Sequence, residues 1–133
     1  MLIIAGAYTY SYILQPSYTI NNKGSVVADP IAVDLGKCIM HENIPVSIIL
    51  RNTGSQPVRF IGVGEYCTAG GICFKGNIAQ GNIPPQGSFS LNCHVVIHRS
   101  GVFADKLQIF IDDNGSLEEI QVPVKGEGYE NEQ

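Results

Sequence analysis

The stretch Arg51-Asn52-Thr53-Gly54-Ser55-Gln56-Pro57-Val58 decides the fold class, because it places a tight turn between two apolar runs. Val46-Ser47-Ile48-Ile49-Leu50 precedes the turn, and Arg59-Phe60-Ile61-Gly62-Val63 follows it. Val, Ile and Phe suit a pleated, half-buried strand, and Asn52 and Gly54 are residue types that accept the positive φ of a turn. The stretch therefore predicts an all-β scaffold, but it discloses no chemistry.

The composition fits one small domain of many short strands. Of the 133 residues, 44% are hydrophobic and only 15% are charged, and 15 Gly and 7 Pro are spread along the chain. A chain of this length buries a core without depending on disulfides, and the profile argues against disorder and against a helical bundle. The net charge of −4 and the 8 scattered Lys and Arg residues disfavour nucleic acid as a partner.

From about residue 25 onward, short apolar runs replace the i, i+3, i+4 pattern of helices. The expected strands are Ser25–Leu35 with Pro30 at an edge or bulge, Pro45–Arg51, Val58–Tyr66, a short Ile72–Lys75, Ser88–Ile97, Val102–Ile111 and Leu117–Lys125. About seven antiparallel strands over roughly a hundred residues predict an immunoglobulin-like β-sandwich.

Period-two alternation also predicts the core and the turns. We expect inward side chains at Phe89, Leu91, Cys93, Val95, Ile97, Phe103, Leu107, Ile109, Ile111, Ile120, Val122 and Val124. Pro84-Pro85-Gln86-Gly87 is expected to turn, with Gly87 supplying the reverse bend. Asp112-Asp113-Asn114-Gly115 is a strong hairpin signal.

Residues 1–22 form an apolar N-terminal segment, without a charged residue before Lys23. The run Leu2–Leu14 is shorter than the roughly 20 residues of a spanning helix, and it lacks the basic start of a signal peptide. Three interpretations fit: a truncated membrane anchor, a short signal sequence, or an extra strand containing Tyr8, Tyr10 and Tyr12. We divide the chain into this segment, a sandwich domain over 23–128 and a polar tail over 129–133.

Several short motifs follow one another in a characteristic order along residues 25–128. They are Asp34-Leu35-Gly36, Asn52-Thr53-Gly54 with Pro57-Val58, Cys67, Pro84-Pro85-Gln86-Gly87, Gly101-Val102-Phe103 and Gly126. In order and spacing they resemble the bacterial Ig-like domains of unknown function that carry a Cys-Gly-Cys loop after the third strand. Those domains are similar to hydin-type (ASH) and PapD-like sandwiches.

The resemblance implies a sandwich fold, together with an N-terminal signal or single membrane anchor that exposes the domain outside the cytoplasm, in the periplasm or cell envelope. It implies no established activity. One departure concerns the cysteine loop, which reads Cys67-Thr68-Ala69-Gly70-Gly71-Ile72-Cys73 in this chain. The geometry of the cysteine pair must therefore differ from that of the relatives.

Four cysteines in an exported domain indicate disulfide bonding, and four cysteines allow three connectivities. Cys67 and Cys73 flank a Gly-rich loop, so their Cα atoms can approach closely enough for a bridge. We expect this bridge. Cys38 and Cys93 are expected either as free core thiols or as a second pair.

Patterns for metal binding and catalysis are weaker. Cys67, Cys73, His41, His94 and His98 are metal-ligand types, but their spacing fits no zinc pattern, so we interpret the histidines as ordinary surface residues. The acidic pairs Asp112-Asp113 and Glu118-Glu119 are expected in a solvated turn. We therefore predict no catalytic, cofactor-binding or metal-binding residues.

The expected function is that of a non-enzymatic structural or protein-binding module, tethered to a membrane through its N-terminal segment. Its contact surface is expected at a sheet edge or at the loop from Cys67 to Gly81. The alternative is a thiol-based metal-binding or redox module that uses Cys67 and Cys73.

Overall fold

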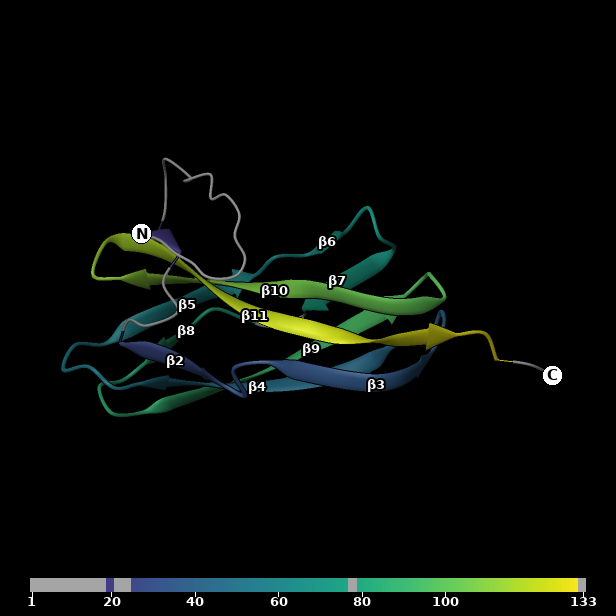
Figure 1. Cartoon of the computed structure of the whole chain (residues 1–133). Helices are drawn as coiled ribbons and strands as arrows, with labels where there is room; N and C mark the ends of the chain where they lie inside the picture. The colour runs from purple at the N-terminus through teal and green to yellow at the C-terminus, as the bar shows by residue number, and fades with distance from the viewer. Residues whose placement is uncertain (1–18, 21–24, 77–78, 132–133) are drawn as a thin grey trace, which may run out of the picture.

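The computed structural model describes residues 19–20, 25–76 and 79–131, which form two β-sheets (Figure 1). The six-stranded sheet has the order β1-β11-β10-β5-β8, and β3 also pairs with β11, whereas the five-stranded sheet has the order β2-β4-β9-β7-β6. The strands are β1 (Thr19–Ile20), β2 (Val26–Asp29), β3 (Val33–Ile39), β4 (Ile44–Asn52), β5 (Val58–Val63), β6 (Tyr66–Cys67), β7 (Ile72–Gly76), β8 (Gly81–Ile83), β9 (Ser88–Ile97), β10 (Gly101–Asp113) and β11 (Ser116–Tyr129). The all-β, Ig-like prediction is confirmed.

The core contains the side chains that the alternation predicted. Every expected inward position is buried except Phe89, which is partly buried and packs against the core. The central strand β9 pairs with β4 on one side and with β7 on the other. Period-two burial therefore holds along the strands on which the fold prediction depended.

The expected first strand is in fact two strands that belong to different sheets. β2 pairs with β4 in the five-stranded sheet, and β3 pairs in parallel with β11 in the six-stranded sheet. Pro30 lies between them and has no N–H to donate to a ladder. The residue that was expected at an edge or bulge thus stands where the chain changes sheets.

The expected strand Val58–Tyr66 is also divided between the sheets. β5 pairs with β10 in the six-stranded sheet, while β6 pairs with β7 in the five-stranded sheet. The Gly-rich stretch that follows was expected to hold at most one short strand, yet it contains both β7 and β8. β8 has three residues, too few to show an alternating pattern.

The turn after β4 does not use positive φ angles, so this part of the prediction was wrong. Neither Asn52 nor Gly54 lies in the left-handed region. Asn52 acts through its buried side chain instead: its amide nitrogen donates to the carbonyls of Gln56 (2.8 Å) and Ile83 (3.0 Å), and its oxygen accepts from Gly54 N–H (2.9 Å). These bonds satisfy backbone groups that burial would otherwise leave unpaired.

The other two turns lie where they were expected, and only the first of them differs in which residue makes the bend. In the turn at 84–87 the positive φ belongs to Gln86 (62°) rather than to Gly87, whose N–H donates to Pro84 O at 2.9 Å. Between β10 and β11, Asn114 (φ 55°) and Gly115 (φ 89°) both adopt positive φ, as a type I′ hairpin requires.

The predicted anchor, signal or strand over residues 1–22 lies outside the described residues, apart from Thr19–Ile20. These two residues form β1, which pairs in parallel with Glu118 and Glu119 of β11. β11 continues to Tyr129, four residues beyond the expected end, because its last residues pair with β3. The part of the chain that the structure describes holds no apolar helix of membrane-spanning length.

Candidate functional site at the bridged hairpin

The hairpin of β6 and β7 is closed by a compact turn. Thr68 N–H donates to Ile72 O (2.8 Å), Gly71 N–H donates to Thr68 O (3.0 Å), and Ile72 N–H donates to the Thr68 hydroxyl (3.2 Å). Gly71 has a φ of 89°, a conformation that glycine adopts without strain. The Gly-rich sequence therefore forms a defined turn.

A disulfide joins Cys67 to Cys73 across this hairpin. The two residues are directly opposite each other, and their Cα atoms are 3.9 Å apart. The bond ties the two-residue edge strand β6 to β7. Because a metal ligand must be a free thiolate, the bridged pair favours a structural role over metal binding.

Cys38 and Cys93 are buried and unbridged. Burial raises the pKa of the Cys93 thiol to about 11. Burial likewise raises the pKa of Cys38, although a hydrogen bond from the backbone of Glu127 opposes the shift. Both thiols are thus protonated near neutral pH, which makes them poor nucleophiles.

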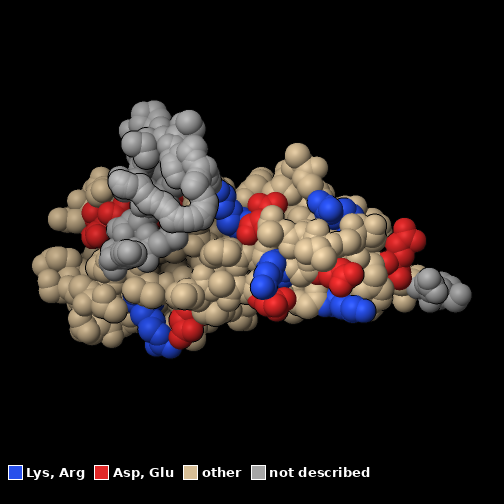
Figure 2. All heavy atoms as spheres, viewed as in Figure 1, with Lys and Arg blue, Asp and Glu red and all other residues tan. Residues whose placement is uncertain are grey.

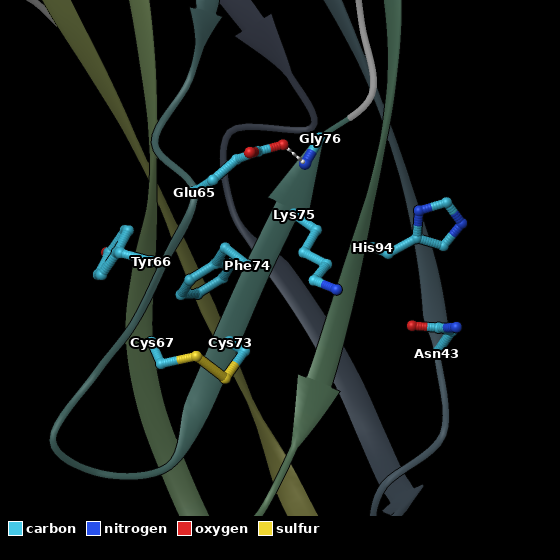
Figure 3. Close-up of a pocket in the computed structure, with 9 residues that line it drawn as sticks. All are labelled: Asn43, Glu65, Tyr66, Cys67, Cys73, Phe74, Lys75, Gly76 and His94. Carbon is cyan, nitrogen blue, oxygen red and sulfur yellow. Dashed lines mark hydrogen bonds between the residues drawn. A yellow bond between two sulfur atoms is a disulfide. The ribbon is translucent and has the colours of Figure 1, made fainter.

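A groove of about 620 Å³ lies beside the hairpin (Figure 3). It is lined by Asn43, Glu65, Tyr66, Cys67, Cys73, Phe74, Lys75, Gly76 and His94. The disulfide links β6 to β7, Lys75 lies on β7, and His94 and Asn43 lie to one side of them (Figure 3). The register of β7 and β9 places Lys75 directly opposite His94.

Contacts within the lining hold the groove in shape. The rings of Tyr66 and Phe74 lie with their centroids 5.4 Å apart, and the Tyr66 hydroxyl donates to Lys106 O at 2.8 Å. Burial, followed by the charges of Asp105 and Glu119, raises the pKa of Tyr66 to about 12. Tyr66 therefore keeps its proton and serves as a hydrogen-bond donor.

The polar side chains of the groove include both a cation and an anion. Lys75 and His94 are exposed, whereas the Glu65 carboxylate accepts from Gly76 N–H at 2.9 Å. Within residues 19–20, 25–76 and 79–131, no group of three or more His, Cys, Asp or Glu side chains that could hold a metal ion occurs. The Lys75 side of the groove can thus donate to an acidic or hydrogen-bond-accepting group.

The three histidines separate into one groove residue and one pair. His94 lines the groove, but His41 and His98 meet outside it, with their Nδ1 atoms 2.9 Å apart. Sequence reasoning treated all three as independent surface residues. No local pattern signalled the pair, because the two residues are 57 positions apart in the chain.

The acidic pair at 118–119 differs from its expected place in a solvated turn. Glu119 is 1% exposed, and in the six-stranded sheet it pairs with Phe110 of β10 and with Ile20 of β1. The side-chain amides of Gln108 (3.0 Å) and Gln121 (2.9 Å) donate to its carboxylate. These hydrogen bonds hold the Glu119 carboxylate within the packed fold, which indicates a structural role rather than a place in a cleft.

Charged side chains of both signs are mixed on the face shown in Figure 2. Lys and Arg lie beside Asp and Glu there. One ion pair of the described residues joins Arg51 to Asp29, whose Nη2 and Oδ2 atoms are 3.0 Å apart. This face therefore presents alternating charge rather than a stripe of one sign.

Comparison with known proteins agrees with this architecture. A family model described as HYDIN/CFA65/VesB-like, Ig-like domain matches residues 24–127. No curated protein sequence matches the chain.

Among solved structures, the chain is similar to the ASH / PapD-like domain 7 of human CEP192, with a TM-score of 0.59, 12% identity, and coverage of 97% of this chain and 99% of that one. It is also similar to the VesB protease of Vibrio cholerae, with a TM-score of 0.59 and 12% identity, covering 80% of this chain but 32% of the protease. A third match is WR4, an MSP family member from C. elegans, with a TM-score of 0.54, 12% identity, and coverage of 75% and 95%. At these identities the likeness concerns the fold alone.

Proposed function

The chain belongs to the HYDIN/CFA65/VesB-like family of Ig-like domains, and on that premise we propose that it is a non-catalytic protein-binding module. The groove beside the bridged hairpin is its contact surface. The observation that carries the proposal is the combination of a groove of about 620 Å³ with a wall that a disulfide holds in place. A fixed wall lowers the ordering cost of binding.

The contact is made by side chains rather than by strand addition at this edge. β6 already pairs with Cys73 and Phe74, and the Glu65 carboxylate takes the N–H of Gly76. Because the outer strand β6 has only two residues, this edge offers few free backbone groups to an incoming strand. The loop surface is therefore favoured over the sheet edge, and both had been expected as contacts.

The chemistry of the groove indicates an acidic partner surface. Lys75 supplies a cation, and His94 and Asn43 supply further polar groups beside it. An Asp or Glu side chain of the partner would gain a charge-assisted hydrogen bond from Lys75.

We further propose that the module works outside the cytoplasm, tethered through its apolar N-terminal segment. A disulfide persists in an oxidising compartment. In intact cells, a reductant and a maleimide that do not cross the cytoplasmic membrane should together label Cys67 and Cys73. Labelling that appears only after lysis would place the domain inside the cytoplasm and contradict this part of the proposal.

Site-specific photo-crosslinking tests the contact surface. A photoreactive residue at Asn43, on the groove, should capture a partner, and the same residue at the exposed position Lys37 of β3 should not capture it. Lys75→Glu should abolish the product formed at position 43, whereas Lys125→Glu, on β11, should preserve it. Equal capture of the partner at positions 43 and 37 would refute the groove as the contact surface. A crosslinked product whose yield Lys75→Glu leaves unchanged would refute it as well.

A further inference from the structure

We propose that His41 and His98 together bind one divalent transition-metal ion of the Zn²⁺ or Cu²⁺ type. Their Nδ1 atoms lie 2.9 Å apart, and their ring centroids are 5.0 Å apart with the ring planes inclined at 41°. Both side chains are exposed. Burial therefore does not force the rings together, and the two nitrogens face each other at a position that is open to solvent.

Backbone hydrogen bonds position both histidines before any ion binds. His41 N–H donates to Ile97 O (2.9 Å), next to His98, and His98 N–H donates to Gly71 O (2.7 Å). The turns after β3, β6 and β9 are thereby tied together at one end of the sandwich. The disulfide-bridged hairpin thus supports the backbone of His98.

His41 also has an uncommon backbone conformation. Its φ is 71°, in the left-handed region that a residue with a side chain seldom occupies. Such residues persist where surrounding contacts hold them, and they cluster at functional sites. Here the held conformation is the one that aims the ring at His98.

The geometry requires only a small adjustment to accept a metal. Two nitrogens bound to Zn²⁺ at about 2.0–2.1 Å in a tetrahedral site are about 3.3 Å apart. The rings must therefore separate by a few tenths of an ångström and turn until both Nδ1 lone pairs point at the ion rather than at the other ring. The hydrogen bond between the rings uses one Nδ1–H. On metal binding that ring moves its proton to Nε2, and both Nδ1 lone pairs face the ion.

Imidazole nitrogen selects this class of ion. It suits Zn²⁺, Cu²⁺ and Ni²⁺, and Cu²⁺ binds most tightly in the Irving–Williams order. No third His, Cys, Asp or Glu of the described residues joins the pair. The remaining coordination positions are therefore left to water or to a ligand from another molecule. This site shares no side chain with the groove, so it does not depend on the proposed protein-binding function.

Calorimetric titration of the whole chain with zinc chloride tests the proposal. The native protein should bind one Zn²⁺ per chain, and His41→Asn and His98→Asn should each weaken binding at least tenfold. Asn is chosen because it tolerates the positive φ at position 41. His94→Asn is the matched control and should bind as the native protein does. Circular dichroism verifies that each variant is folded.

The ¹⁵N resonances of the imidazoles supply a second readout that does not require a variant. Zinc should shift the Nδ1 signals of two histidines and leave those of the third unchanged. The proposal fails if the native chain binds no zinc at millimolar concentration, if His94→Asn weakens binding as much as the other two substitutions, or if coordination occurs through Nε2.

Discussion

Strand β9 and the edge strand β6 belong to the same sheet, yet different forces hold them. β9 lies between β4 and β7, and its inward side chains Leu91, Cys93, Val95 and Ile97 are at most 1% exposed. β6 is a two-residue edge strand that a disulfide and a tight turn attach to β7. Burial therefore stabilises the centre of the sheet, whereas local covalent and turn geometry stabilises its edge.

Replacing Leu91 by Ala should produce the largest effect and tests the central side of this contrast. The side chain is fully buried, so its removal should lower the free energy of unfolding by about 2–5 kcal/mol. Urea denaturation measures the change. Ser90→Ala, at the exposed neighbouring position, should have little effect. A loss below about 0.5 kcal/mol for Leu91→Ala would contradict the burial of this face.

Alkaline pH tests the same strand through Cys93. The thiol has an ordinary pKa of 9.0, and in the folded protein burial raises the pKa to about 11. As the pH rises above 9, the unfolded chain loses this proton first, so unfolding is favoured. The protonated Cys93 thiol therefore contributes fully to the free energy of unfolding below pH 9, and this contribution is lost by about pH 11. At about 1.4 kcal/mol per pKa unit, the total loss is about 3 kcal/mol.

Comparison of the native protein with Cys93→Ala isolates this effect from other groups, including Tyr66, that titrate in the same range. The difference in unfolding free energy between the two proteins should narrow between pH 9 and 11. If the unfolding free energies of the two proteins instead change in parallel across that range, burial does not raise the pKa of the Cys93 thiol.

Removing the disulfide should have the smallest effect and tests the edge side of the contrast. The Cys67→Ser/Cys73→Ser double variant loses a crosslink between residues separated by six positions, which is worth about 2 kcal/mol in the chain-entropy model. Hydrogen exchange should accelerate at Thr68 and Ile72 while the amides of β9 remain protected. Equal acceleration in β9 would mean that the hairpin and the centre unfold as one unit.

The parts of the fold that were predicted correctly depend on close neighbours in the sequence. Alternation along Ser88–Ile97 identified the buried face of β9, and Asn114-Gly115 identified the hairpin between β10 and β11. The pairing of Cys67 with Cys73 across a short loop also follows from local chain geometry. Within a few residues, backbone sterics and side-chain periodicity leave few alternatives.

The features of the fold that the sequence did not predict depend on residues that are far apart in the chain. Nothing near Asn52 indicates that its side chain bonds Ile83 O, 31 positions away. Nothing near Pro30 indicates that the chain leaves one sheet for the other, because the partners β4 and β11 lie later in the sequence. The acceptors and neighbouring strands that decide these features exist only after packing.

The amino-acid order was therefore sufficient for strand interiors, for the I′ turn and for an all-β sandwich, since each of these follows from short-range backbone preference and from the burial of alternate side chains. Packing in three dimensions decided which sheet each strand joined, which residues line the groove, and that His41 meets His98. Those outcomes require contacts between segments that the chain itself keeps apart, and such contacts form only when the two sheets close over a common core.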